Sequence, residues 1–437
     1  MISASAVHYA HEWILADQGV GMTGKEFAEF GSRLKIEHEG QFLEVTFIKR
    51  DGDELVFKLP SGYNVRFSFK TVKLLEILEE SHGNNKHAME VATIGSGSRK
   101  ISLLSTGGTI SSKVDYATGA VKPTEDIGFI LDSIRDIKEK ITLKAKIIDS
   151  ILSENMQPDN WIRTGRLVSK ALDEEDAVVL LHGTDTMSYT ASALAFMFEK
   201  QSGPIILTGS QRSSDRPSSD AFENIEASVR FSMEQIGEVG ICMHSSISDG
   251  RSTLIRGVRA RKMHTTRRDA FRAIESGELG SIVDKKVLLS RDVKGPDAGT
   301  IFSDKLDQAA GIYYFNPLSN QDDLESFSTK KKAVVIMATG LGHVADRLLP
   351  KIRELTDEGK HFVITSQCLY GRVDLEVYAS GRKLLAAGAV PLENMLPETA
   401  LTKSMYVLAH HPDEFETWMT KNLRGEISER SLLGGEL

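Results

Sequence analysis

The chain has 437 residues, of which 41% are hydrophobic and 26% are charged, and its formal net charge is −8. This length exceeds one ordinary hydrophobic core and favours two or three domains. The acidic balance argues against a chain that holds a nucleic acid backbone by itself, and no apolar run reaches the ~18 residues that cross a bilayer. The two cysteines, Cys242 and Cys368, have no metal-binding spacing. Since the N-terminus also lacks a signal-peptide pattern, a reducing cytoplasm is expected.

Residues 1–95 differ in pattern from the rest of the chain. Short alternating apolar runs such as Phe42–Ile48 and Glu54–Leu59 are separated by turn residues at 51–53 and 60–64. Four or five short strands at even spacing predict a small N-terminal β-barrel domain. It holds no catalytic set, and it would either bind a partner or nucleic acid or act as a rigid spacer. The polar Gly95–Ser98 segment indicates a linker at its end.

Residues 96–310 alternate strand and helix patterns, which is typical of βαβ units and a parallel sheet. Residues 311–437 read as a second, smaller α/β domain, with strands at 333–340 and 361–366. The tail at 423–430 is polar, so we expect it to be exposed. The chain is therefore predicted to be an α/β protein with a small β domain in front.

Two strand-like runs each end in a turn that carries hydroxyls. Thr106-Gly107-Gly108-Thr109 follows the first run, and His182-Gly183-Thr184-Asp185 follows the second. In open α/β sheets ligands bind beyond the carboxyl ends of the strands, and hydroxyls beside a carboxylate suit nucleophilic acyl transfer. Two plainer readings remain open at this point. A Gly-rich turn also binds phosphate or merely reverses the chain, and the second motif could be a helix N-cap.

These motifs, Thr106–Ile110 and His182–Met187, resemble the two signature motifs of the L-asparaginase/glutaminase family and stand in its order. The segment Arg259–Phe271 is similar to the family's catalytic lysine segment. The resemblance implies an asparaginase-like core of two α/β domains with a parallel sheet. It also implies a set of catalytic residues, Thr109 as the nucleophile with Thr184, Asp185 and Lys262 as the second group.

Three further residues gain a substrate-binding role only through this resemblance. Tyr116 follows the first motif, where the family has a loop tyrosine against the nucleophile. Ser153 and Glu154 stand in the family's substrate-clamp segment, which holds the α-carboxylate and α-amine, and Glu154 replaces the Gln of many extracellular members. On spacing alone Tyr116 is a packing residue and Ser153 an N-cap. Lys262 would likewise be an ordinary surface charge. His182 and His264 read as structural, because the family's chemistry does not use them.

The N-terminal domain is not found in free-standing asparaginases. Together with Lys58–Asn64 and the Gly425–Ile427 tail, it makes the chain resemble the glutaminase components of archaeal tRNA-dependent amidotransferases. This implies that the chain hydrolyses glutamine and passes ammonia to a transamidating partner of the E type. The partner would hold most of Glu-tRNA(Gln) and use ATP with Mg. No metal or cofactor is expected in this chain, and a homodimer core within a heterotetramer is expected.

Two other functions stay open on the sequence. A free-standing cytoplasmic L-asparaginase would share every site residue, and one methylene changes the discrimination between glutamine and asparagine by only ~1–3 kcal/mol. A non-enzymatic scaffold that holds a nucleotide is the second alternative. Against it, neither GxxxxGK[ST] nor GxGxxG with an acidic partner occurs where the fold would need it.

Overall fold

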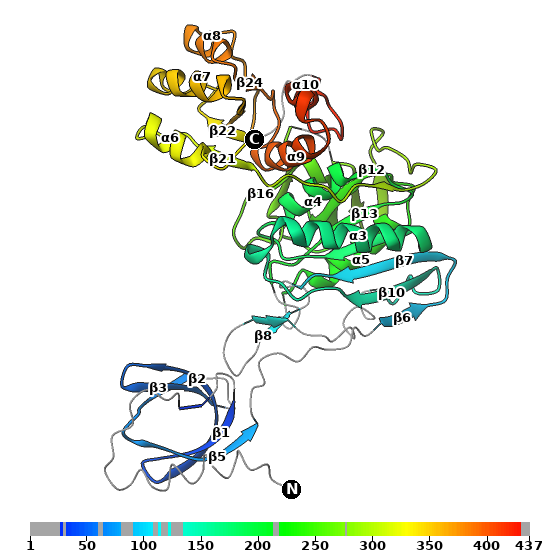
Figure 1. Cartoon of the computed structure of the whole chain (residues 1–437). Helices are drawn as coiled ribbons and strands as arrows, with labels where there is room; N and C mark the ends of the chain where they lie inside the picture. Colours follow the sequence, from blue (N-terminus) through cyan, green and yellow to red (C-terminus); the bar gives the residue numbers. More distant parts are fainter. Residues whose placement is uncertain are drawn as a thin grey trace. The chain divides into compact units, whose positions relative to one another are not determined.

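The computed structural model describes residues 27–28, 32–59, 64–79, 91–107, 112–114, 121–123, 134–212, 218–275 and 278–429 (Figure 1). The chain divides into two compact units. One comprises Met1–His87 with Val114–Ala120, and the other comprises Ala88–Lys113 with Val121–Leu437. Among the described residues, no helix combines the length and the apolar character that crossing a membrane requires.

The first unit is built on a five-stranded antiparallel sheet in the order β4-β3-β2-β1-β5. Its strands alternate inward apolar and outward polar residues, so Leu34, Ile36, Leu55 and Phe57 form a small core. The strands are β1 (Arg33–His38), β2 (Gln41–Asp51), β3 (Glu54–Lys58), β4 (Asn64–Ser68) and β5 (Val72–Glu79).

The barrel predicted for this unit is seen as an open sheet. No ladder joins the edge strands β4 and β5 among the described residues. Two register shifts in the β1–β5 ladder bend the sheet, and Figure 1 shows its strands curling round. Alternation in a sequence predicts strands but not closure, because closure depends on the tilt and stagger of the whole sheet.

The second unit contains a nine-stranded sheet in the order β19-β18-β15-β14-β13-β11-β7-β10-β6. The five strands from β14 to β10 are parallel, while the strands on both flanks are antiparallel. The sheet is therefore mixed, whereas the sequence pattern predicts a parallel one. The strands are β6 (Val91–Gly95), β7 (Arg99–Ser105), β10 (Ile141–Ile147), β11 (Ala177–Leu181), β13 (Ile205–Thr208), β14 (Val239–His244), β15 (Arg251–Arg256), β18 (Gly280–Val283) and β19 (Lys286–Leu289).

Helices cover both faces of this sheet. Val178 and Leu180 of β11 share one hydrophobic cluster with α3 (Pro158–Glu174) and α4 (Met187–Met197). The alternate residues Val179 and Leu181 share another with α5 (Ala221–Ser232). A strand that is buried on both faces reads as a continuous apolar run, which is why β11 could be predicted.

A smaller parallel sheet, β21-β22-β23-β24, follows, and β22 and β23 confirm the strands predicted at 333–340 and 361–366. Its elements are β21 (Ala310–Tyr314), α6 (Gln321–Ser328), β22 (Ala333–Ala338), α7 (Leu349–Asp357), β23 (His361–Ser366), α8 (Ala379–Ala386), β24 (Val390–Pro391), α9 (Pro397–His410) and α10 (Phe415–Thr420). Helix α9 packs on α4, where the hydroxyls of Ser192 and Thr402 lie 2.7 Å apart. The two α/β layers thus share a common interior.

Short elements complete the described chain. Three two-stranded ladders pair β8 (Ser112–Val114) with β9 (Val121–Pro123), β12 (Phe198–Lys200) with β20 (Ile301–Phe302), and β16 (Ala260–Lys262) with β17 (Phe271–Ala273). The single-turn helices are η3 (Ser153–Asn155), η4 (Gly257–Arg259), η5 (Asp346–Leu348) and η6 (Pro412–Glu414).

The tail after α10 is buried at its centre, contrary to the exposed tail expected from its polar sequence. Glu426 and Lys403 of α9 are both 0% exposed, and Lys403 Nζ donates to Glu426 Oε1 at 2.6 Å. The backbone N–H groups of Leu423 and Arg424 donate to the same carboxylate. Burial lowers the pKa of Lys403, and the charge of Glu426 opposes that shift. Charged residues enter a core when each polar atom finds a partner, which a sequence pattern does not reveal.

Candidate active site

The carboxyl ends of β7 and β11 lie side by side, since Ser105 is in register with Leu181 in the parallel ladder. Thr106 continues the pairing, because both its N–H and its hydroxyl donate to Leu181 O at 3.0 Å. The two sequence motifs therefore start from the same edge of the sheet, as predicted. This edge is where open α/β sheets bind ligands.

The first turn begins with Thr106, which is buried, and Gly107, whose φ is +103°. A Cβ atom on Gly107 would lie 2.8 Å from the backbone nitrogen of Ile151, so only glycine fits this approach. The predicted nucleophile Thr109 and the loop residue Tyr116 lie outside the described residues. Their roles remain predictions.

The second turn meets the lysine segment directly. Lys262 Nζ donates to Thr184 Oγ1 and to Asp185 Oδ1, each at 2.8 Å. The Lys262 side chain is only 15% exposed, whereas that of Asp185 is 66% exposed. Because Thr184 Oγ1 accepts a bond from the ammonium, its own proton is free to point toward another acceptor. A hydroxyl, a carboxylate and an ammonium thus meet at the edge of the sheet.

Ser153 lies against this turn. It is buried on η3, and a Cβ atom on Gly183 would lie 2.8 Å from Ser153 Oγ. Thr186 Oγ1 donates to Ser153 O at 2.7 Å, a link that the sequence analysis missed although Thr186 stands within the second motif. The N-cap reading of Ser153 is wrong, because Leu152 is the N-cap of η3. Glu154 follows on η3 with an exposed side chain, next to the site.

The two histidines of these segments are engaged in local structure. His182 is fully buried, and its Nδ1–H donates to Gly183 O at 2.6 Å while Nε2 accepts from Thr190 Oγ1 at 2.9 Å. Burial lowers the pKa of His182 to about 4, so the ring is neutral at pH 7. His264 Nδ1 accepts from the backbone N–H groups of Thr266 and Arg267 and closes a turn. These contacts support the structural reading of both rings.

The strand that ends at Lys262 is anchored from the second α/β layer and the tail. Arg259 is fully buried, and its guanidinium donates to Asn394 O at 2.7 Å and to Gly425 O at 3.0 Å. Arg261 Nη1 donates to Glu398 Oε2 at 2.9 Å. Sequence analysis missed these anchors because arginine is usually exposed. The Gly425–Ile427 and Arg259–Phe271 segments entered the sequence analysis only through their resemblance to the family.

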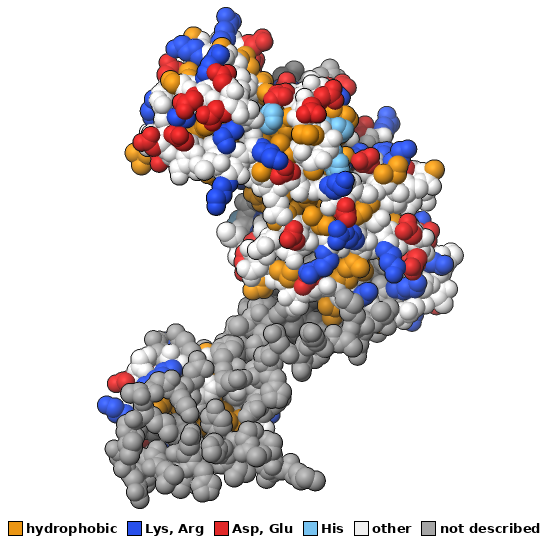
Figure 2. Space-filling view, viewed as in Figure 1, with side chains coloured by type: hydrophobic (Ala, Val, Ile, Leu, Met, Phe, Trp, Pro, Cys, Tyr) orange, Lys and Arg blue, Asp and Glu red, His pale blue; other side chains and the backbone are white. Residues whose placement is uncertain are grey.

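The side of the molecule that Figure 2 shows carries no continuous basic track over the described part of the second unit. Lys and Arg side chains there intermingle with Asp and Glu over the described part of the second unit. This agrees with a net charge of −8. A polyanion lying on this side would therefore need further contacts to hold it firmly.

Comparison with known proteins matches both α/β layers to family models. The model "Asparaginase, N-terminal" matches residues 100–294, which include Thr184, Asp185 and Lys262. The model "Glutaminase/Asparaginase C-terminal domain" matches residues 311–419. Among solved structures, the thermostable L-asparaginase of Thermococcus kodakarensis is similar at 30% identity and a TM-score of 0.69, covering 76% of this chain and 100% of its own. L-asparaginase I of Vibrio cholerae is similar at 28% identity and a TM-score of 0.65, covering 76% of this chain and 99% of its own.

Longer matches come from curated relatives. The D subunit of the glutamyl-tRNA(Gln) amidotransferase of Thermoplasma acidophilum is 44% identical over 401 residues, covering 92% of this chain and 97% of the relative. The corresponding D subunit of Saccharolobus islandicus is 41% identical over 394 residues, covering 87% of this chain and 88% of the relative. The chain therefore belongs to the asparaginase/glutaminase family and, within it, to the family of glutamyl-tRNA(Gln) amidotransferase D subunits.

Proposed function

We propose that this chain is the glutaminase component of a tRNA-dependent amidotransferase that converts Glu-tRNA(Gln) to Gln-tRNA(Gln). One observation carries the choice over a free-standing L-asparaginase. The asparaginases match at full length yet cover about three quarters of this chain, whereas the D subunit of T. acidophilum matches 92% of it. The additional N-terminal unit is thus shared with the amidotransferase relatives.

The proposed chemistry begins with the Thr109 hydroxyl, which attacks the side-chain amide carbonyl of glutamine. The tetrahedral intermediate expels ammonia and leaves a γ-glutamyl ester on Thr109, which water then hydrolyses to glutamate. The bonds from Lys262 Nζ to Thr184 and Asp185 support a proton path. Thr184 would take the proton of the attacking hydroxyl as it passes its own proton to a deprotonated Lys262, and the same path would return a proton to the departing ammonia. Backbone N–H groups of the turn at 182–185 are the candidates for stabilising the oxyanion.

Substrate recognition falls to the residues beside this turn. Ser153 and Glu154 would bind the amino-acid end of glutamine, with Asp185 also available to its ammonium, and Tyr116 would lie against the nucleophile. The burial of Ser153 against Gly183 supports this arrangement. A carboxylate at Glu154 can pair with an ammonium, so it is a reasonable replacement for Gln.

The remaining parts of the proposal concern the assembly. A homodimer core within a heterotetramer would join this chain to a transamidating partner of the E type in the cytoplasm. The partner would hold Glu-tRNA(Gln) and use ATP with Mg, while this chain works without a cofactor. We also propose that the N-terminal sheet closes into a barrel, and the register shifts that bend its β1–β5 ladder support this.

The test is ammonia release from glutamine and from asparagine. The chain would be assayed alone, and then with the transamidating partner, Glu-tRNA(Gln) and ATP. Glutamine hydrolysis that rises sharply with these additions is expected, and Thr109→Ala should abolish it while the circular dichroism spectrum stays unchanged. Strong asparagine hydrolysis that ignores the additions would instead establish the free-standing asparaginase, and full activity of Thr109→Ala would refute the nucleophile.

A further inference from the structure

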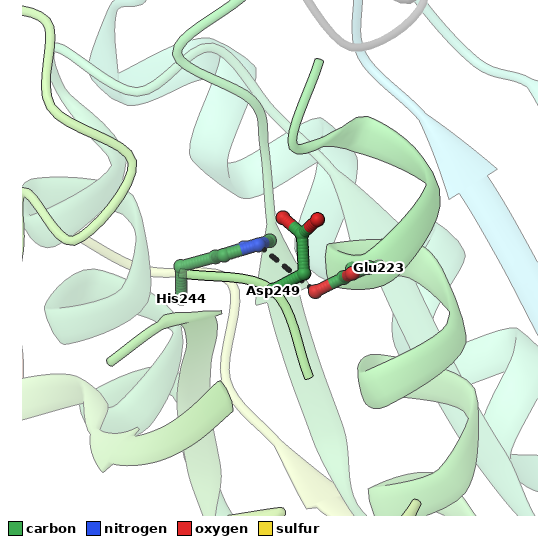
Figure 3. A group of neighbouring side chains, drawn as sticks. All are labelled: Glu223, His244 and Asp249. Atoms are coloured by element: carbon green, nitrogen blue, oxygen red, sulfur yellow. Dashed lines mark ion pairs between the residues drawn. The ribbon is translucent and has the colours of Figure 1, made fainter. Parts of the chain in front are cut away.

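A second group of polar side chains lies at the end of β14 and takes no part in the proposed chemistry. Glu223 comes from α5, His244 ends β14, and Asp249 stands in the turn before β15. One nitrogen or oxygen atom from each of the three residues lies within 4.8 Å of the other two. Figure 3 shows the three side chains converging from these separate segments.

The tautomer of His244 is set by its neighbour Asn224. Asn224 Nδ2 donates to Gly209 O at 2.9 Å and to Asp220 Oδ2 at 3.0 Å, which orients the amide and leaves its oxygen toward His244. Asn224 Oδ1 lies 2.7 Å from His244 Nδ1 and can only accept, so Nδ1 carries the proton. In the neutral ring, Nε2 then presents a lone pair.

That lone pair faces a carboxylate. His244 is fully buried, and its Nε2 forms no hydrogen bond with the described residues although it lies 3.0 Å from Glu223 Oε2. Two electron-rich atoms at this separation repel each other unless a cation lies beside both. The cation is either a proton on Nε2, which is poorly aligned for a hydrogen bond, or a metal ion.

We propose that Glu223, His244 and Asp249 bind a divalent transition-metal ion of the zinc type. One imidazole and two carboxylates suit Zn²⁺ better than Mg²⁺, which prefers oxygen ligands alone. Histidine ligands usually donate their other ring N–H to an oxygen, as Nδ1 does here toward Asn224. Tetrahedral bonds of about 2.0–2.2 Å place ligand atoms roughly 3.4 Å apart. The pair of His244 and Glu223 is already close to this spacing, whereas the exposed Asp249 side chain, which is paired with Arg268, would have to move toward them.

Arg268 shares one ligand with the proposed ion. Its Nη1 donates to Asp249 Oδ1 and its Nη2 to Ile247 O, so a positive charge stands beside the site. The guanidinium would weaken metal binding by repulsion and by competition for the carboxylate. Arg268→Gln should therefore tighten the binding of the metal, a result that a site without metal cannot give.

The experiment uses the full chain after treatment with EDTA. Titration calorimetry with ZnCl2 should give one site per chain, and saturating Zn²⁺ should raise the unfolding temperature. Glu223→Gln and Asp249→Asn should each weaken binding at least about tenfold and remove the thermal shift. Glu226→Gln is the matched control, because Glu226 lies on the same helix and pairs with Arg230 instead.

Two results would overturn the proposal. Zn²⁺ binding that persists unchanged in Glu223→Gln and Asp249→Asn would be adventitious. Absence of stoichiometric Zn²⁺ binding in the wild type would mean that His244 is protonated and paired with Glu223. Asp249 lies on an exposed turn, so Asp249→Asn keeps the test valid even where Glu223→Gln disturbs α5. The experiment measures metal affinity, so a failure of the metal-site proposal is independent of the proposed glutaminase activity.

Discussion

The Lys262 ammonium donates both to the Thr184 hydroxyl and to the Asp185 carboxylate, and these two bonds decide which protons the site can move. Thr184 is buried while Asp185 is exposed, so the lysine bridges the interior and the solvent. The motif at 182–187 could be recognised in the sequence because its residues are adjacent. The contact with Lys262 spans 78 positions, and a family resemblance was needed to suggest it.

Replacing Lys262 by Met should remove the group that exchanges a proton with Thr184. We expect turnover of glutamine to fall by about 10²–10⁴-fold with a smaller change in KM. Steady-state ammonia release measures both quantities. Lys294→Met is the control, because the Lys294 side chain is 53% exposed and pairs with Asp297 rather than with Thr184 or Asp185. Turnover near the wild-type value in Lys262→Met would remove the lysine from the mechanism.

His182 should make the protein less stable in acid. Its pKa is about 4 in the folded chain and near 6.5 when unfolded, so the unfolded state binds a proton first. Its contribution to stability is complete above pH 6.5 and is lost as the pH falls toward 4, by up to roughly 3 kcal/mol. Urea unfolding at pH 7 and pH 5 measures this loss. In His182→Gln the unfolding free energy should change less between pH 7 and pH 5. An identical change in the variant and the wild type would show that other groups cause the loss.

Among the elements, β16 illustrates how a short strand is positioned by distant parts of the chain. Arg259 and Arg261 on either side of Ala260 are held by Asn394, Gly425 and Glu398. Buried strands such as β11, β22 and β23 could be predicted because their apolar runs are continuous. The burial of the tail could not, since it depends on the pairing of individual charges rather than on hydrophobic pattern.

The buried pair of Lys403 and Glu426 should be costly to break from one side. Glu426→Gln leaves an ammonium uncompensated in the core, and we expect a loss of about 3–5 kcal/mol in unfolding free energy. Lys403→Met together with Glu426→Gln should restore part of that loss, because no buried charge remains. Asp346→Asn is the control. Its partner Lys383 and Asp346 itself are both more than half exposed, so the change should be below about 1 kcal/mol. Equal losses of unfolding free energy in Glu426→Gln and Asp346→Asn would contradict the argument.

At the scale of the whole molecule, each of the two units carries a hydrophobic core of its own. The cluster around Leu34 and Phe57 contains only residues of the first unit. The alternation of strands and helices predicted the parallel centre of the large sheet but not its antiparallel flanks. Parallel strands need long crossovers that a sequence pattern displays. The flanking strands carry weaker apolar runs, and only β14–β15 and β18–β19 are joined by short turns.

A chain that begins at Ala88 should keep its second unit folded, because the contacts of Lys262, Thr184, Asp185 and Ser153 all lie within that unit. We expect glutamine hydrolysis of the same order as in the full chain but no stimulation by the partner and Glu-tRNA(Gln). Ammonia release with and without these additions measures both the basal hydrolysis and the stimulation, and circular dichroism is the folding control. Full stimulation of the shortened chain would make the N-terminal unit a spacer.

The anchoring of Arg259 has a consequence for protein synthesis. Its partners Asn394 and Gly425 lie 135 and 166 positions later in the chain, so they leave the ribosome long after the lysine segment does. A nascent chain carries Thr184 and Lys262 before it carries the groups that hold their strand in place. On the proposed chemistry, we expect a chain that still lacks Asn394 and Gly425 to hydrolyse glutamine poorly, because nothing holds the Arg259 end of the lysine strand in place.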